Sequence, residues 1–267
     1  MRADSNVALH TGNAMPVLGL GTWELTHDTT GTVLHALELG YRMIDTAADY
    51  GTQPGIGAAL RQSGLDRDAV YVVAKVEEDE DAWQATRSNL AELGLDYADL
   101  VLIHRPPGRR AGVELWEGLV RAKADGLAKD IGVSNYRIEQ IRELAEASGE
   151  TPAVNQIEWS PFGYSTEMLD YCRRNGILIQ AYSPLTRARR LRDEELAFIA
   201  DTYGKSTAQL LIRWSLQLST VPLPKANRPG HLAENIRVFD FDITAYDMAR
   251  LSNLNEHYSS LTSLPYV

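Results

Sequence analysis

The sequence predicts a protein of the α/β class, a single (β/α)8 TIM barrel spanning residues 1–267. Short apolar runs rich in Val, Ile and Leu alternate with longer segments in which apolar residues recur at helical spacing. Polar residues follow three of the runs at nearly equal intervals, and no linker or low-complexity tract divides the chain. Alternating strands and helices of this number favour parallel pairing, right-handed crossovers and closure into a barrel.

The chain begins with a predicted N-terminal β-hairpin. Residues 7–16 alternate in polarity and turn at residues 11–13, Thr-Gly-Asn. Residues 17–21 are the candidate first strand of the barrel. Their Gly-x-Gly lacks the third glycine that opens a helix in a dinucleotide-binding fingerprint, since Trp23 and Glu24 occupy that region. We therefore reject a Rossmann fold.

Helices and strands then alternate to the end of the barrel. Helical spacing predicts helices over residues 32–39, 56–61, 81–93, 113–124 and 138–149. Apolar runs predict strands at residues 42–44, 70–74, 100–103, 129–133, 154–158, 178–182 and 220–224. A capping box, Ser206 to Gln209, opens a further helix because each side chain satisfies an orphan backbone donor.

Composition excludes several classes of protein. The formal net charge of −10 argues against non-specific nucleic-acid binding, which needs a basic surface. No apolar run approaches the roughly 20 residues that span a bilayer, and the N-terminus has no signal-peptide pattern. The single cysteine, Cys172, has no partner for a bridge and is expected to be buried in a helix. We expect a soluble, cytoplasmic monomer.

The most informative stretch is residues 40–51. Asp45 stands at the end of one predicted strand, and Tyr50 follows in the loop. Lys75 and His104 close two later strands, 30 and 29 residues further on (75 − 45 and 104 − 75), which matches one strand, one helix and their loops. Because parallel strands of a barrel end at the same mouth, where the active sites of this fold lie, the four side chains are expected to converge.

These residues resemble the Asp-Tyr-Lys-His tetrad of the aldo-keto reductases, with bacterial-type reductases of small aldehydes or diketogluconate as the nearest kind. The resemblance extends over further motifs in order: Leu-Gly-Leu-Gly-Thr-Trp at 18–23, Gly-Val-Ser-Asn at 132–135, Asn-Gln-Ile-Glu at 155–158, Ala-Tyr-Ser-Pro-Leu at 181–185, Leu-Pro-Lys at 223–225 and Glu-Asn-Ile at 234–236. It implies an NAD(P)H-dependent oxidoreductase that reduces aldehydes or ketones to alcohols.

The tetrad suits this chemistry. A side chain cannot donate hydride, so a nicotinamide must supply it, and Tyr50 is the candidate proton donor. A free phenol has a pKa of about 10, and the Lys75 ammonium is expected to lower it. Asp45 is expected to keep Lys75 charged. His104 either orients the substrate oxygen or shares in proton relay, and the sequence leaves both roles open.

The resemblance also implies the cofactor contacts. Ser134, Asn135 and Gln156 match residues that hydrogen-bond the nicotinamide carboxamide, and Tyr182 matches the ring that stacks on the nicotinamide. Ser183 to Leu185 match a loop along the pyrophosphate. The remaining cofactor positions are Thr22, Lys225, Arg228, His231, Glu234 and Asn235.

Two positions in this region depart from the family pattern. Ala226 stands where a serine usually follows the phosphate-binding lysine, and His231 stands where an arginine is usual. Lys225 with Arg228 can still pair with a 2′-phosphate. We expect NADPH as the cofactor, with NADH as the second candidate.

The substrate side is predicted from Trp23 and Arg105, with a small carbonyl compound as partner. Arg105 replaces the tryptophan of a common His-Trp-Pro pattern and either binds a substrate carboxylate or pairs with acidic residues outside the cleft. The acidic run 77–81 is expected to be a solvated loop and helix start. In the resembled family the C-terminal segment shapes the substrate pocket.

Two other functions remain open at this point. A barrel lysine can act as a Schiff-base aldolase, for which Lys75 is the obvious candidate. A non-catalytic barrel could instead bind NADP(H) as a redox sensor, although the complete tetrad speaks against it.

Overall fold

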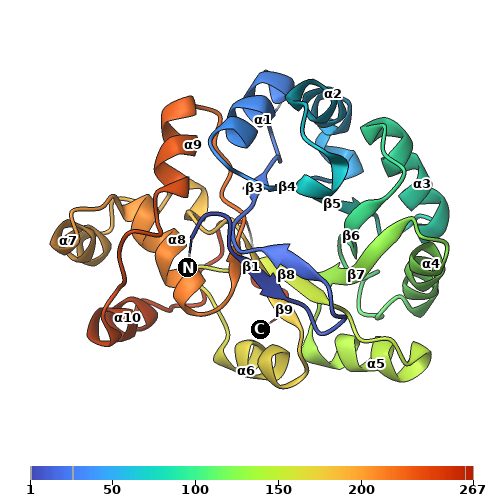
Figure 1. Ribbon diagram of the computed structural model, residues 1–267. Helices are drawn as coiled ribbons and strands as arrows, with labels where there is room; N and C mark the ends of the chain where they lie inside the picture. The colour runs from blue at the N-terminus through green and yellow to red at the C-terminus, as the bar shows by residue number, and fades with distance from the viewer. Residues whose placement is uncertain (1, 26, 262, 267) are drawn as a thin grey trace.

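The computed structural model describes residues 2–25, 27–261 and 263–266. Eight parallel strands curl into a barrel, and helices surround it (Figure 1). The strands lie side by side in chain order from β3 to β10. The Gly19 N–H donates to the carbonyl of Pro222 at 3.1 Å, and the Gly21 N–H donates to that of Pro224 at 3.2 Å. These bonds join the first strand to the last, so the predicted (β/α)8 barrel is confirmed.

The barrel strands fall close to the predicted runs. Their bounds are β3 Leu20–Gly21, β4 Met43–Asp45, β5 Tyr71–Val76, β6 Ala98–Ile103, β7 Ala128–Ser134, β8 Val154–Glu158, β9 Leu178–Tyr182 and β10 Val221–Pro222. Every residue of β5 and β6 is buried, as expected for a parallel sheet that is covered on both faces.

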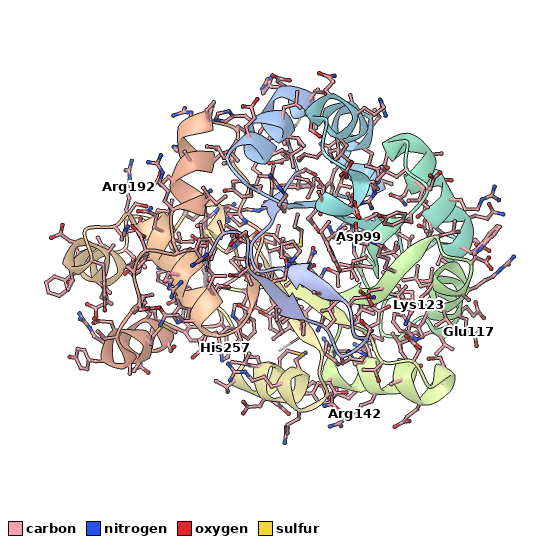
Figure 2. The ribbon with its side chains drawn as sticks, viewed as in Figure 1. Asp99, Glu117, Lys123, Arg142, Arg192 and His257 are labelled. Atoms are coloured by element: carbon pink, nitrogen blue, oxygen red, sulfur yellow. The ribbon has the colours of Figure 1, made fainter. Side chains whose placement is uncertain are left out.

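The helices form the outer layer. Their bounds are α1 Thr29–Glu38, α2 Gln53–Ser63, α3 Ala82–Leu93, α4 Val113–Ala124, α5 Ile138–Ser148, α6 Thr166–Arg174, α7 Glu194–Thr202, α8 Thr207–Gln217, α9 Pro229–Ile236 and α10 Ala245–Ser252. Helix α8 begins with the predicted capping box, whereas α7, α9 and α10 lie outside the predicted helices. Glu117 and Arg142 illustrate the exposed charged faces that point away from the barrel (Figure 2).

The predicted N-terminal hairpin is also confirmed. Strands β1 (Asn6–Ala8) and β2 (Ala14–Pro16) pair in antiparallel fashion, and Figure 1 shows them lying across one end of the barrel. Met15 packs in one buried cluster with Val73 and Leu100 of the barrel strands. The hairpin therefore closes the end opposite the strand termini that carry the tetrad.

The Gly-x-Gly of the first strand serves barrel closure. A Cβ atom on Gly21 would lie 3.0 Å from the Leu223 carbonyl oxygen, a tight contact with backbone that cannot easily move. Only glycine therefore allows the first strand to approach the last this closely. This agrees with the rejection of a dinucleotide-binding fingerprint.

The helix-to-barrel core buries the single cysteine as predicted. Cys172 lies in α6 with 1% of its surface exposed, and burial raises the pKa of its thiol to about 12. Among the helices of the described residues, none has the length and apolarity that crossing a bilayer requires.

Candidate active site

A cavity of about 1050 Å³ opens at the carboxyl ends of the barrel strands. It brings together nearly all of the predicted site residues. Those on its wall are Thr22, Trp23, Asp45, Tyr50, His104, Arg105, Ser134, Asn135, Gln156, Tyr182, Ser183, Leu185, Lys225, His231, Glu234 and Asn235. Lys75 is fully buried behind this wall. Arg228 is exposed at the start of α9 and does not line the cavity.

A buried ion pair lies beneath the cavity. The Lys75 Nζ donates to both carboxylate oxygens of Asp45 at 2.8 Å and to the Thr46 carbonyl at 3.3 Å. Burial alone would lower the pKa of Lys75, but the charges of Asp45 and Tyr50 and the hydrogen bonds outweigh it, so the pKa lies above its ordinary value. Lys75 is therefore held as an ammonium, as the sequence predicts.

Gln156 ties this pair to the cavity wall. Its Nε2 donates to Asp45 Oδ1 at 2.7 Å and to Gln180 Oε1 at 2.8 Å. Both amides are buried. The carboxylate of Asp45 is thus fixed by hydrogen bonds as well as by charge, which restricts the position of the ammonium above it.

Tyr50 ends a 3-10 turn, Ala48–Tyr50, rather than lying in an irregular loop. Gly51 follows in the left-handed conformation, with φ of 65°. The Lys75 Nζ lies 5.1 Å from the centre of the Tyr50 ring. Burial raises the pKa of the phenol, and the lowering by Lys75 does not offset it. Lys75 thus lowers the pKa of the phenol as expected, but burial, together with the negative charges of Asp45 and Asp49, outweighs this effect, so the net pKa lies above its ordinary value.

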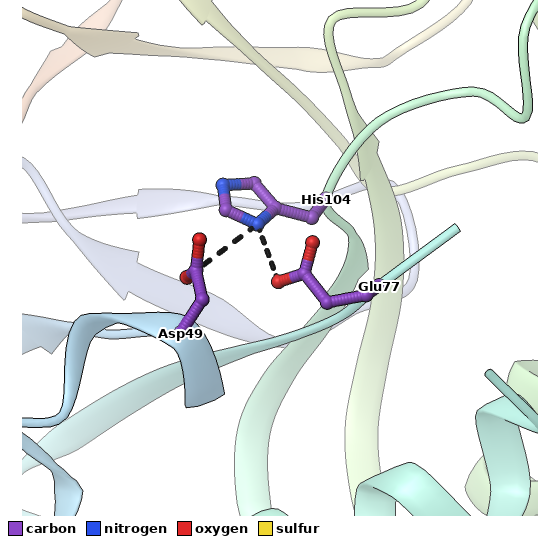
Figure 3. Close-up of side chains that lie close together, drawn as sticks. All are labelled: Asp49, Glu77 and His104. Atoms are coloured by element: carbon purple, nitrogen blue, oxygen red, sulfur yellow. Dashed lines mark hydrogen bonds and ion pairs between the residues drawn. The ribbon is translucent and has the colours of Figure 1, made fainter. Parts of the chain in front are cut away.

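His104 lies next to Tyr50, between the carboxylates of Asp49 and Glu77 (Figure 3). Its Nδ1 is 2.7 Å from Glu77 Oε1 and 3.9 Å from Asp49 Oδ1. The Tyr50 and His104 rings meet edge to face, with centroids 5.8 Å apart. The side chains of the predicted proton donor and the predicted substrate-orienting group therefore share one wall of the cavity.

Arg105 combines features of the two alternatives that the sequence left open, because it lines the cavity and is also paired with acidic residues. Its side chain is 51% exposed, with Nη2 at 3.5 Å from Glu77 Oε2 and 3.7 Å from Asp49 Oδ2. Its Nε lies 3.6 Å from a carboxylate oxygen of Glu78. The guanidinium therefore already faces three carboxylates at the cavity rim.

The residues predicted to hold the nicotinamide form one hydrogen-bonded set. The Tyr182 hydroxyl donates to Asn135 Oδ1 at 2.8 Å, and Asn135 Nδ2 donates to the His104 carbonyl at 3.1 Å. The Ser134 hydroxyl donates to the Gln156 carbonyl at 2.8 Å. These side chains are prearranged at the barrel mouth and combine amide groups with an aromatic ring, which suits a nicotinamide carboxamide and its ring.

The loop that leaves β9 is strained. Ser183, Thr186, Arg187 and Ala188 have φ angles of 47°, 52°, 49° and 64°, which only glycine adopts at low cost. The Arg187 guanidinium lies 4.0 Å from the centre of the Trp23 ring, so this loop contacts the segment that follows β3 at the cavity rim. Strained backbone of this kind clusters at ligand-binding sites.

One lysine and the polar face of α9 form another part of the cavity wall. Lys225 follows β10 and is partly buried, and His231, Glu234 and Asn235 come from α9. A lysine beside a polar helix face suits a phosphate group on an adenosine. The donor set along the cavity, which combines amides, an aromatic ring and a cation, fits a nicotinamide dinucleotide.

The sequence analysis did not assign several residues of this site. The sequence predicts that the run 77–81 is solvated. For Glu77 this prediction is wrong, because its carboxylate contacts His104. Asp81, in contrast, caps α3 by accepting the Gln84 N–H. The register of β5 and β6 pairs Val76 with Ile103. Residues 77 and 104, which follow these strands, are therefore neighbours. The register that reveals this contact comes from the structure and not from a sequence motif.

The C-terminal tail forms another part of the wall, as the resemblance implies. Leu261, Ser263 and Pro265 line the cavity. The buried Glu158 at the end of β8 holds the tail, because its carboxylate accepts from the Ser259 hydroxyl at 2.6 Å and the Ser260 N–H at 2.7 Å. No sequence motif indicated this anchor.

A family model described as the aldo/keto reductase family matches residues 17–256. The chain belongs to the aldo/keto reductase family. It is therefore an NAD(P)H-dependent oxidoreductase of carbonyl compounds, and the resemblance seen in its sequence is confirmed. As a member of this family it acts on small carbonyl substrates.

Individual relatives agree with this assignment. The chain is 40% identical over 257 residues to an aldo-keto reductase of Mycobacterium sp. (strain MCS), covering 94% of this chain and 91% of the relative. It is 36% identical to the glyoxal reductase of Bacillus subtilis (strain 168), covering 94% and 92%.

Solved structures share the fold as well. An aldo/keto reductase of Brucella melitensis superposes with a TM-score of 0.88 at 35% identity, covering 94% of this chain and 99% of that one. A Bombyx mori aldo-keto reductase in complex with NADP gives a TM-score of 0.92 at 32% identity, covering 98% and 96%.

Proposed function

We propose that this aldo/keto reductase reduces small aldehydes and ketones to alcohols with NADPH, and that Tyr50 donates the proton. The observation that carries the proposal is the buried Lys75–Asp45 pair directly beneath the Tyr50 ring at the floor of the cavity. Such a pair is costly to bury, and a positive charge held at this place stabilises a phenolate that forms next to it.

The cofactor is proposed to lie along the cavity. When bound, NADPH supplies the hydride that no side chain can donate. Ser134, Asn135 and Gln156 bind the carboxamide, and the Tyr182 ring covers one face of the nicotinamide. The proposed contacts with the rest of the dinucleotide are made by Thr22, Ser183, Leu185, Lys225, His231, Glu234 and Asn235, with Arg228 at the edge.

Tyr50 completes the reaction by protonating the carbonyl oxygen. As hydride arrives at carbon, the oxygen becomes an alkoxide, which is a stronger base than a phenolate. Tyr50 can therefore give up its proton although burial raises its pKa, and Lys75 stabilises the phenolate that remains. General acid catalysis of this kind contributes roughly 10²- to 10⁴-fold.

The charges at the rim favour neutral substrates. Arg105 already faces the carboxylates of Asp49, Glu77 and Glu78, so an anionic substrate at this guanidinium meets three like charges. We therefore propose small uncharged aldehydes and dicarbonyls as substrates, in line with the glyoxal reductase name of the Bacillus relative. Trp23 offers an apolar surface on the substrate side.

A screen of purified protein tests this function. NADPH and NADH oxidation is followed with neutral aldehydes, dicarbonyls and keto acids of matched size. We expect turnover with NADPH and neutral carbonyls, and weaker turnover with keto acids. Cofactor binding without turnover would favour a redox sensor, and a lysine adduct trapped by borohydride with substrate alone would favour an aldolase. Size-exclusion chromatography checks the expectation of a monomer.

A further inference from the structure

The contact between Glu77 and His104 is built into the barrel. Both residues directly follow paired strands, since β5 ends at Val76 and β6 ends at Ile103 in register. The His104 N–H donates to the Val76 carbonyl at 2.8 Å, which fixes the two chain ends side by side. The side-chain contact of 2.7 Å therefore follows from strand register rather than from a chance orientation on the surface.

Both oxygens of the Glu77 carboxylate face positive groups. Oε1 contacts His104 Nδ1, and Oε2 lies 3.5 Å from the Arg105 guanidinium. Burial raises the pKa of this carboxyl, but the hydrogen bond and charge of His104 with the other nearby cations outweigh it, so the pKa lies below its ordinary value. Glu77 is thus an ionised carboxylate at neutral pH.

An ionised carboxylate only accepts hydrogen bonds. At 2.7 Å from Glu77, Nδ1 must therefore carry the proton, and in a neutral ring Nε2 then has none. Nε2 lies on the side of the ring away from Glu77 (Figure 3), and no described residue hydrogen-bonds it. His104 lines the cavity, so Nε2 is the nitrogen available to a substrate.

We propose that Glu77, braced by Arg105, is a positioning residue that keeps the proton on Nδ1 of His104. The consequence is a division of roles by ring charge. The imidazolium donates a hydrogen bond from Nε2 to the carbonyl oxygen during reduction, whereas the neutral ring accepts one from the alcohol hydroxyl during oxidation. The catalytic consequence rests on the proposed function. The tautomer does not, because it follows from the distance between Glu77 and His104.

The titratable and charged groups that face the ring come from three elements. Asp49 and Tyr50 of the 3-10 turn and Glu77 after β5 lie against the ring. Arg105, next to His104, and Lys75 in β5 act on the ring through their charges on Glu77. Glu77 is the nearest carboxylate to Nδ1. Its removal should therefore change the tautomer, whereas removal of a neighbouring charge without this contact should not.

Nitrogen-15 NMR of histidine-labelled protein tests the tautomer without any catalysis. Spectra of the wild type are recorded at alkaline pH, where the ring is neutral, and a His104→Asn variant identifies its signals. We expect His104 with a protonated Nδ1 and a bare Nε2. Glu77→Leu should shift the ring towards a protonated Nε2, and Glu78→Gln, which removes the adjacent carboxylate, should leave it unchanged.

A pH profile then tests the consequence. In the wild type, kcat/KM for reduction should be lower when the ring is neutral than when it is an imidazolium, because the neutral ring has no proton on Nε2 to donate. In Glu77→Leu the neutral ring can donate from Nε2, so the ratio of variant to wild-type kcat/KM should rise with pH.

A wild-type spectrum with a protonated Nε2 overturns the proposal even if no variant folds, and so does an unchanged tautomer in Glu77→Leu. A ratio that stays constant with pH overturns the consequence, while absent turnover in the wild type contradicts the proposed function instead.

Discussion

The Lys75 Nζ lies 2.8 Å from both carboxylate oxygens of Asp45, and the side chains of this pair are 0% and 5% exposed. Replacing such a pair with apolar residues often leaves stability unchanged or improves it, so stability alone does not account for a buried pair. Its place beneath Tyr50 provides a reason, because it delivers a fixed positive charge to the ring that donates the proton.

Asp45→Asn should destabilise the protein strongly. The amide fills the same space but leaves the buried ammonium without a counter-ion, and breaking a buried pair in this way costs about 3–5 kcal/mol. Urea unfolding at neutral pH measures the change. Asp49→Asn, at a carboxylate that is 44% exposed, is the control and should change the free energy of unfolding by less than about 0.5 kcal/mol. Equal stability of both variants would show that Lys75 does not depend on Asp45.

Stability should fall at alkaline pH because of buried phenols. Burial raises the pKa of Tyr41, Tyr71, Tyr136, Tyr182 and Tyr266 above the ordinary value. Below about pH 10 both states hold these protons, and above it only the folded state does, so stability is complete below about pH 10 and is lost as pH rises.

The loss can be measured by urea unfolding at several pH values. Each phenol that stays protonated only in the folded state adds about 1.36 kcal/mol per pH unit to the slope. Tyrosinate absorbance should appear together with unfolding. A free energy of unfolding that does not change between about pH 10 and 11 would mean that these phenols ionise in the native protein.

Lys225 should determine the preference for NADPH. Lys225→Ala removes a charge-assisted hydrogen bond worth about 1.5–3 kcal/mol, so the KM for NADPH should rise roughly ten- to hundredfold while that for NADH changes little. Arg142→Ala is the matched control, because Arg142 is also cationic but lies on the exposed face of α5, away from the cavity wall. Steady-state kinetics with both cofactors measure the effect. Equal increases for NADPH and NADH would remove Lys225 from the 2′-phosphate site.

Glu158 should control substrate binding through the C-terminal tail. Its carboxylate accepts hydrogen bonds from Ser259 and Ser260, and the tail beyond them lines the cavity. In Glu158→Gln the amide cannot accept from all of these donors, so the tail should loosen and the KM for the carbonyl should rise severalfold at an unchanged cofactor Kd. Glu167→Gln on the exposed face of α6 is the control. A loss of cofactor affinity without a change in carbonyl KM would contradict the assignment.

The features that could be predicted from the sequence depend on short motifs and on their regular spacing along the chain. The equal spacing of Asp45, Lys75 and His104 predicted their convergence, because each follows a strand of the same parallel barrel. The Ser206 capping box predicted the start of α8 for the same local reason.

The remaining features depend on packing between distant segments. The raised pKa of Tyr50 follows from how deeply the finished cavity buries it. Glu158 meets Ser259 across 101 positions of the sequence, and no short motif encodes that contact. Glu77 was treated as part of an acidic surface run, since its role appears only from the register of β5 and β6.

Replacing Tyr50 with phenylalanine tests the central claim most directly. The substitution removes the donated proton and leaves the ring, so the fold and the Kd for NADPH should stay unchanged. The rate of carbonyl reduction under saturating NADPH should fall by roughly 10²- to 10⁴-fold. Turnover within a few-fold of the wild type, at an unchanged cofactor Kd, would contradict the assignment of Tyr50 as the proton donor.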